Sequence, residues 1–172
     1  MQSIIKFFFL LSVISSYQVL LAKAELKVGD KAPMFSGRDE EENFVDMNNL
    51  RGKWVVLYFY PKDDTPGCTI EAKQFTDLYQ DFLKNNVSVY GISTDTRESH
   101  CDFRDKYKLK IPLIPDVDQR IMSLFDVEVS DGFASRDTIV IDPSGDIAKV
   151  YRKVRPSGHP KDVLDFIKEG SE

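Results

Sequence analysis

The chain has 172 residues, enough for one domain with a hydrophobic core. Hydrophobic residues make up 42% and charged residues 30%, which argues against disordered, collagen-like and multi-span membrane proteins. The net charge is −5 and no basic cluster is present, so a nucleic-acid-binding surface is not expected. The only cysteines are Cys68 and Cys101, which excludes a disulfide-rich scaffold and a four-cysteine zinc or iron–sulfur site.

The first 24 residues have the layout of a secretory signal peptide. Lys6 precedes an apolar stretch, Phe7–Ala22, and residues 22–24 form an A-x-A cleavage pattern. The alternative is an uncleaved membrane anchor, but this stretch contains three Ser and one Gln and is shorter than the ~20 residues that span a bilayer. We therefore expect cleavage after Ala24 and export to a periplasm or the medium. The mature chain, a single domain over residues 25–172, is not expected to associate stably with a membrane.

Strand and helix patterns alternate along the rest of the chain. Turn signals over residues 28–47 predict an N-terminal β-hairpin, with the acidic run Asp39–Glu42 as a solvated turn. The apolar run Trp54–Tyr60 is typical of a strand buried on both faces. The further predictions are, in order, a helix over 66–84, a strand over 87–93, a helix over 96–107 with Asp95 and Glu98 as a capping box, a strand over 111–114, a helix over 119–125, strands over 138–141 and 147–154, and a helix over 160–167. This alternation predicts an α/β fold with a central sheet flanked by helices.

The segment Pro61–Cys68, PKDDTPGC, joins the buried strand to a helix. Thr65 suits the N-cap and Pro66 the first helical position, which places Cys68 third in the helix. Its sulfur would then lie beside unpaired N–H groups at the positive end of the helix dipole, conditions that stabilise a thiolate. The Thr65 hydroxyl is expected to reach the same amides and the sulfur. The alternatives for Cys68 are a packed, inert thiol and half of a structural disulfide.

A thiolate at this position is suited to attack on a peroxide. Breaking the O–O bond builds negative charge on the departing oxygen, which preorganised donors and a cation would stabilise. The cation must come from elsewhere in the fold. Arg136, just before the predicted strand 138–141, is the candidate.

The pattern Pro61-x-x-x-Thr65-x-x-Cys68 matches the active-site motif of the peroxiredoxins. The longer stretch FYPKDDTPGCTIEA resembles the bacterioferritin comigratory protein, or peroxiredoxin Q, subfamily. The resemblance continues over nearly all of 25–172, through GDKAPMF, LRGKWVVLYFYPK, STDTRESHCDFRDKYKL, IPLIPD and RDTIVIDPSGDI. It implies a thioredoxin-like fold with a mixed central sheet. It also implies an antioxidant thiol peroxidase that reduces hydrogen peroxide and organic hydroperoxides with no metal, haem, flavin or other cofactor.

The resemblance also assigns roles by position. Cys68 is the peroxidatic cysteine and becomes a sulfenic acid. Thr65 binds the peroxide, Pro61 shields the sulfur, and Arg136 supports the thiolate and the peroxide oxygen. Glu71 matches a family residue that lies near this arginine.

The sequence departs from the family at the resolving cysteine. Many members place it five residues after the peroxidatic one, where this chain has Lys73, and others place it near the position of Arg104. Here Cys101 would have to condense with the sulfenic acid, after local unwinding. A thioredoxin-like or glutaredoxin-like dithiol would then reduce the Cys68–Cys101 disulfide, in a monomer. The alternatives are a one-Cys peroxidase with Cys101 as a spectator and a permanent structural disulfide.

Two other classes of function stay open from the residues. A protein thiol–disulfide oxidoreductase normally needs C-x-x-C, but Thr65 stands where the first cysteine would be. A non-enzymatic thioredoxin-fold binding module would leave Cys68 unreactive. His100 and His159 have no zinc-ligand spacing with the cysteines. We expect His100 to support its helix or face water, and His159 to have a local structural role.

Overall fold

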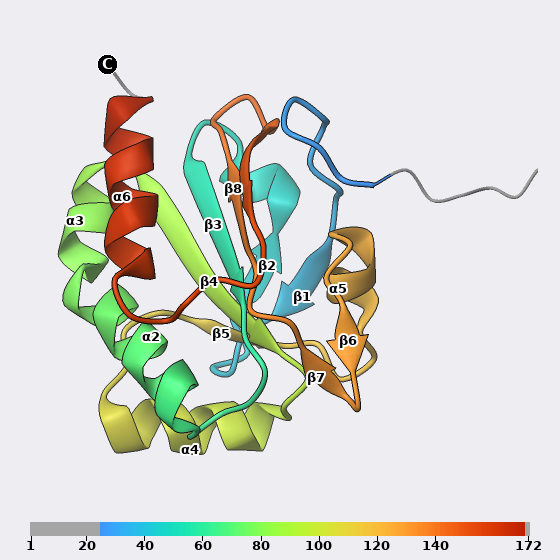
Figure 1. The fold of residues 1–172 in the computed structure, drawn as a ribbon, viewed down its shortest axis with the longest axis vertical. Coiled ribbons are helices and arrows are strands. Elements are labelled where there is room, and N and C mark those ends of the chain that lie inside the picture. The colour runs from blue at the N-terminus through green and yellow to red at the C-terminus, as the bar shows by residue number, and fades with distance from the viewer. Residues whose placement is uncertain (1–24, 171–172) are drawn as a thin grey trace, which may run out of the picture.

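The computed structural model describes residues 25–170 and has a five-stranded sheet at its centre (Figure 1). The strand order is β5-β4-β3-β8-β9. These strands are β3 (Trp54–Phe59), β4 (Val87–Ser93), β5 (Leu113–Pro115), β8 (Thr138–Ile141) and β9 (Ile147–Tyr151). β3, β4 and β5 are parallel, whereas β8 is antiparallel to both β3 and β9. The sheet is therefore mixed, as predicted, and the fold is thioredoxin-like.

The middle strand, β3, is buried because both faces of the sheet are covered. Its alternate residues pack into two separate hydrophobic clusters: Val55, Leu57 and Phe59 into one, Val56 and Tyr58 into the other. One face is covered by α2 (Pro66–Asp77), α3 (Tyr79–Lys84) and α6 (His159–Glu169). The other is covered by the hairpin of β1 (Ser36–Arg38) and β2 (Phe44–Asp46), by the 3-10 helix η1 (Met47–Leu50) and by α5 (Arg120–Leu124). The helix α4 (Arg97–Tyr107) lies at the bottom of the view in Figure 1.

The helix predicted over 66–84 is two helices. α2 ends at Asp77 and α3 starts at Tyr79, with Leu78 between them. This break lets Phe75 and Phe82 both face the core, with their ring centroids 5.8 Å apart. The near-helical spacing of apolar residues continues across the break, so the sequence pattern did not reveal the turn between the two helices.

A second short hairpin was not predicted. It consists of β6 (Val129–Ser130) and β7 (Phe133–Ala134), which are joined by Asp131 and Gly132. Both turn residues have positive φ, 53° and 82°. Asp-Gly is a strong signal for this kind of turn, so the hairpin could have been found from that pair alone.

The N-terminal hairpin is confirmed, but the expectation of a solvated acidic turn is wrong for its first half. Asp39 and Glu40 are 4% and 1% exposed. Asp39 accepts hydrogen bonds from the backbone amides of Glu41 and Asn43 and so closes the turn. Glu40 turns inward, and its backbone amide donates to the carbonyl of Leu113 on the edge strand β5. The hairpin is thereby attached to the edge of the central sheet.

None of the helices within residues 25–170 is both long and apolar enough to span a bilayer. The predicted signal peptide, residues 1–24, lies outside the described residues.

Candidate active site

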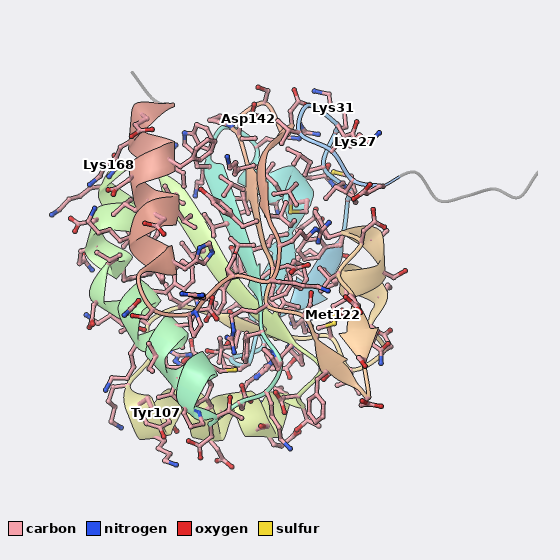
Figure 2. All side chains as sticks on the ribbon, in the orientation of Figure 1. Lys27, Lys31, Tyr107, Met122, Asp142 and Lys168 are labelled. Atoms are coloured by element: carbon pink, nitrogen blue, oxygen red, sulfur yellow. The ribbon has the colours of Figure 1, made fainter. Side chains whose placement is uncertain are left out.

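The predicted motif lies at the carboxyl end of β3, where the loop after the strand leads into α2 beside α4 (Figure 1). This is the end of the molecule at which Tyr107 lies, opposite Asp142 (Figure 2). Thr65 is the N-cap of α2, in extended conformation, and Pro66 is its first residue. Cys68 is the third helical residue, as predicted, and is only 2% exposed. The sulfur is therefore both at the positive end of a helix and shielded from bulk solvent.

Arg136 reaches the sulfur of Cys68, as predicted. Its Nη2 donates to Cys68 Sγ over 3.4 Å. The contact follows from the sheet, because β8 pairs with β3 in antiparallel register, with Tyr58 opposite Thr138. The residues just before β8 therefore lie beside the loop that follows β3. Gly67 leaves room for the guanidinium, since a Cβ at this position would lie 3.2 Å from Arg136 Nη2.

Glu71 holds the other side of the same guanidinium. Its Oε2 lies 2.5 Å from Arg136 Nη1, and its side chain is fully buried. Burial raises the pKa of Glu71 to about 7, although the charge and hydrogen bond of Arg136 act to lower it. Burial also opposes the charge on Arg136, but Glu71 and Cys68 together raise the pKa of the guanidinium above its ordinary value. Arg136 is therefore a permanent cation held between a carboxyl group and the sulfur.

The Thr65 hydroxyl does not cap the helix, so that prediction is wrong. It donates instead to the carbonyl of Lys62 over 3.1 Å, and within the described residues it makes no capping bond to α2. The loop turns at Asp64, whose φ of 57° reverses the chain direction and brings Thr65 back toward Lys62. As a result, Thr65 leaves the amides of the first turn of α2 uncapped.

Cys101 lies on α4 and its environment differs from that of Cys68. It is half-buried, and its Sγ donates to the backbone carbonyl of Glu40 over 3.4 Å. Both cysteines are free thiols. Arg136, the partner of Cys68, precedes β8, whereas Glu40 is bound to β5, and these strands are three interstrand spacings, about 14 Å, apart. The two sulfurs thus contact partners attached to strands that flank the β4–β3 pair on its two edges.

The sequence did not indicate the role of Asp63. Its buried carboxylate accepts from the Tyr60 hydroxyl (2.7 Å), the Ser99 hydroxyl (2.7 Å) and His100 Nδ1 (2.8 Å). His100 is fully buried, so it does not face water, the second of the two expectations for it; its bond to Asp63 agrees with the first, that it supports its helix. Asp63 and His100 are 37 positions apart. No local signal pairs them, although two consecutive acids before a helix start could have drawn attention to the loop.

His159 begins α6 and bonds Thr138 of β8, with Nε2 and Oγ1 2.9 Å apart. Burial lowers its pKa to about 4, which outweighs the raising effect of Asp162. These contacts agree with a local structural role. Within residues 25–170, no group of three or more His, Cys, Asp and Glu side chains could hold a metal ion.

Comparison with known proteins places this geometry in a family. The model of the AhpC/TSA family matches residues 28–150. Peroxiredoxin Bcp of Bacillus subtilis is 34% identical over 154 residues, covering 86% of this chain and 98% of that protein. A mutant of PrxQ from Xylella fastidiosa has a TM-score of 0.78 at 29% identity, covering 87% of this chain and 99% of the other. A bacterioferritin comigratory protein of Xanthomonas campestris, described in terms of its alkyl peroxide reduction activity, has a TM-score of 0.75 at 31% identity and covers 80% and 92%.

Proposed function

The chain belongs to the AhpC/TSA family of peroxiredoxins and is a thiol peroxidase, and we propose that Cys68 is the sulfur that attacks the peroxide. The observation that carries this assignment is the contact of Arg136 Nη2 with Cys68 Sγ at the start of α2. A hydrogen bond from a charged guanidinium to sulfur favours the thiolate, which is the nucleophilic form. A packed, inert thiol has no need of a partly buried cation against it.

In the first step the Cys68 thiolate attacks one oxygen of the hydroperoxide. An S–O bond forms and the O–O bond breaks, so that sulfur is oxidised by two electrons and the peroxide is reduced. The second oxygen leaves as hydroxide or alkoxide and takes a proton from water. Arg136 contacts the sulfur, and Thr65 leaves the amides of Gly67 and Cys68 uncapped, so donors are available to stabilise this charge and lower the barrier.

Thr65 and Pro61 complete the site in this proposal. The Thr65 hydroxyl donates its hydrogen bond to the Lys62 carbonyl, so its oxygen is left to accept a hydrogen bond from the bound hydroperoxide. Pro61, Phe133 and Ala134 form the apolar part of a hollow beside the β6–β7 hairpin, whose other lining residues are Glu128, Ser130, Asp131 and Ser135. The apolar part suits the organic group of an alkyl hydroperoxide, the class named for the Xanthomonas campestris relative.

We propose that Cys101 resolves the sulfenic acid. Its thiol condenses with Cys68–SOH, forming the disulfide and releasing one water molecule. An external thioredoxin-like or glutaredoxin-like dithiol then reduces the disulfide and is itself oxidised to a disulfide. The support is that Cys101 is the one other thiol of the chain and that α4, which carries it, is bound to the active-site loop through Asp63. Since the two sulfurs face different partners, this step requires local unwinding of a helix start.

We also propose that residues 1–24 are a signal peptide and that the enzyme works as a monomer in a periplasm or outside the cell. The support is the sequence pattern Lys, apolar stretch, Ala-x-Ala. Expression in a secreting host should yield an exported chain whose amino-terminal residue is Glu25. An unprocessed chain retained with the membranes would overturn the export proposal without touching the chemistry.

The test of the two sulfur roles is rapid mixing of the reduced protein with stoichiometric hydrogen peroxide, followed by acid quench and mass spectrometry. Mass is a better readout than tryptophan fluorescence, because Trp54 begins β3 and lies at the end of the strand opposite Pro61. The wild type should pass through a one-oxygen adduct to an intramolecular disulfide. Cys68→Ser should show neither, and Cys101→Ser should stop at the adduct. If Cys101→Ser forms the adduct and turns over at the wild-type rate with a dithiol, Cys101 is a spectator in a one-Cys enzyme.

A second assay separates the peroxidase from a protein thiol–disulfide oxidoreductase. The reduced protein should be nearly inactive in reducing insulin disulfides, because it lacks C-x-x-C. Insulin reduction as fast as peroxide reduction would contradict the assignment.

A further inference from the structure

The buried carboxylate of Asp63 connects the active-site loop to the first turns of α4. Asp63 lies in the loop between β3 and α2, yet its Oδ2 accepts from Ser99 Oγ and from His100 Nδ1 on α4. Its Oδ1 accepts from Tyr60 Oη, which fixes the carboxylate against the end of β3. Its exposed fraction is 7%, so these three bonds replace solvation almost completely.

The backbone of the same residue is held as well. The Asp63 amide donates to Asp95 Oδ2 over 2.8 Å, and that oxygen also accepts from the hydroxyl of Ser93 at the end of β4. The next residue, Asp64, makes a different kind of contact with α4. It bonds Lys106 Nζ and Tyr107 Oη, both at 2.6 Å, on the exposed surface. Exposed ion pairs contribute little to stability, so the buried carboxylate of Asp63 is the stronger link.

This link joins the two helix starts that carry the cysteines, at least one of which must unwind before a disulfide can form. Asp63 belongs to the loop that leads into the first turn of α2 and so to Cys68. Ser99 and His100 directly precede Cys101 in α4. The Cys68 sulfur contacts Arg136 while the Cys101 sulfur contacts the Glu40 carbonyl, so at least one helix start has to unwind for the sulfurs to meet. Each bond to Asp63 opposes that unwinding.

We propose that Asp63 is a positioning residue that sets how readily the first turns of α2 and α4 open, and thereby decides the fate of the Cys68 sulfenic acid. This inference rests on the proposed role of Cys101 as resolving cysteine. In the closed arrangement the sulfenic acid stays beside Arg136, where a second hydroperoxide oxidises it to the sulfinic acid and leaves as water or alcohol. In the open arrangement Cys101 condenses with it and one water is released. The bonds of Asp63 favour the closed arrangement, which is also the one that reacts with the first peroxide.

The test compares Asp63→Asn and Ser99→Ala with Asp64→Asn as the matched control. Asn at 63 presents an N–H where the carboxylate accepted two bonds, and Ala at 99 removes one donor while leaving His100 in place. The first readout is independent of redox chemistry: amide hydrogen exchange over 97–101 and alkylation of Cys101 in the reduced, folded protein. We expect both to rise roughly tenfold in Asp63→Asn and severalfold in Ser99→Ala, with no change in Asp64→Asn.

The second readout is the division between the two reactions. In Asp63→Asn and Ser99→Ala the disulfide step should accelerate, the first oxidation of Cys68 should slow, and the sulfinic fraction formed at graded peroxide should fall. His100→Asn keeps an N–H near the place of Nδ1 and should behave much like the wild type. His100→Gln, whose amide extends toward the place of Nε2, should behave like Asp63→Asn. A general loss of packing would not produce this contrast.

Three results would overturn the proposal. One is unchanged exchange and alkylation in both Asp63→Asn and Ser99→Ala, and another is an equal slowing of the two chemical steps. The third is the same change in Asp64→Asn as in Asp63→Asn. Cys101→Ser separates this inference from the proposed function: if that variant still turns over peroxide at the wild-type rate with a dithiol, the resolving role fails. The exchange data then still decide whether Asp63 holds α4 closed.

Discussion

The two cysteines lie near the starts of two helices that both have threonine at the N-cap, yet the two starts are built differently. At α2 the Thr65 hydroxyl donates to the Lys62 carbonyl, away from the helix. At α4 the Thr96 hydroxyl accepts from the amide of Ser99 over 3.3 Å and caps the helix in the ordinary way. The amides at the start of α2 therefore stay available to a substrate, whereas at the start of α4 one amide is used to cap the helix.

The surroundings of the two sulfurs follow the same division. Cys68 Sγ accepts a hydrogen bond from a guanidinium, and Cys101 Sγ donates one to a carbonyl. A hydrogen bond that the sulfur accepts favours the thiolate form, whereas one that the sulfur donates requires the thiol form. A helix start and a cysteine in sequence are thus not sufficient to mark a reactive sulfur. What distinguishes the two is the partner that the tertiary fold places against each.

The largest expected effect is loss of the guanidinium at Cys68. Arg136→Lys should lower the second-order rate of Cys68 oxidation by roughly 100-fold or more, because a single ammonium cannot bond Glu71 and the sulfur together as a fork does. Competition with a heme peroxidase for limiting hydrogen peroxide measures that rate. Arg152→Lys is the matched control, since Arg152 pairs with Asp137 over 2.8 Å and bonds the Phe125 carbonyl rather than the sulfur. Equal rates in the two variants would show that Arg136 does not assist the oxidation of Cys68.

The second effect is a pH dependence of stability that comes from Glu71. Its folded-state pKa of about 7 is above the ordinary value of 4.5, so the fold prefers the neutral carboxyl. This contribution is fully present below about pH 4.5 and is lost as the pH rises through 7, by on the order of 3 kcal/mol. Urea unfolding from pH 4.5 to 8.5, in a Cys68→Ser background, should show the wild type losing stability relative to Glu71→Gln. A difference between the two that stays constant with pH would mean that Arg136 outweighs burial.

The third effect concerns the surroundings of Cys101. Glu40 is buried and its carboxylate bonds Arg104 Nη1 and the Leu113 amide. Glu40→Gln leaves one of these groups mismatched and should lower the free energy of unfolding by about 1–3 kcal/mol. It should also speed alkylation of Cys101, whose thiol donates to the Glu40 carbonyl, and leave Cys68 oxidation unchanged. Glu41→Gln is the control, because Glu41 also pairs with Arg104 but is exposed. Equal effects at the two positions would contradict this account.

The smallest effect separates the two threonine caps. Thr96→Ala removes a capping bond and should cost about 1 kcal/mol, whereas Thr65→Ala removes none and should cost less than ~0.5 kcal/mol. The order should reverse for peroxide reduction, where Thr65→Ala loses the hydroxyl proposed to bind the hydroperoxide. Thermal unfolding and the peroxide competition assay, run on both variants, check the two halves. A Thr65→Ala variant that is as unstable as Thr96→Ala would show that the hydroxyl stabilises α2 after all.

Features that depend on a few neighbouring residues could be predicted from the sequence. The position of Cys68 in its helix follows from Thr65 and Pro66, and the burial of β3 follows from an uninterrupted apolar run. Arg136 was expected as well, from its place just before strand 138–141 and from the family resemblance, whereas the pairing of β8 with β3 that brings it to the sulfur came only from the structure. The N-cap of α4 was off by one residue, because Asp95 bonds the Asp63 amide and Ser93 while Thr96 takes the cap.

The sequence by itself determined the chemistry: a cysteine at a helix start within a peroxiredoxin motif, and one further thiol. Only the tertiary structure decided where the polar groups around these sulfurs are committed. It buried Glu40, paired Asp63 with His100 and turned the Thr65 hydroxyl toward Lys62. The physical reason is that a buried polar group must find a hydrogen-bond partner wherever the fold supplies one. That partner can lie dozens of residues away, beyond the reach of any local pattern.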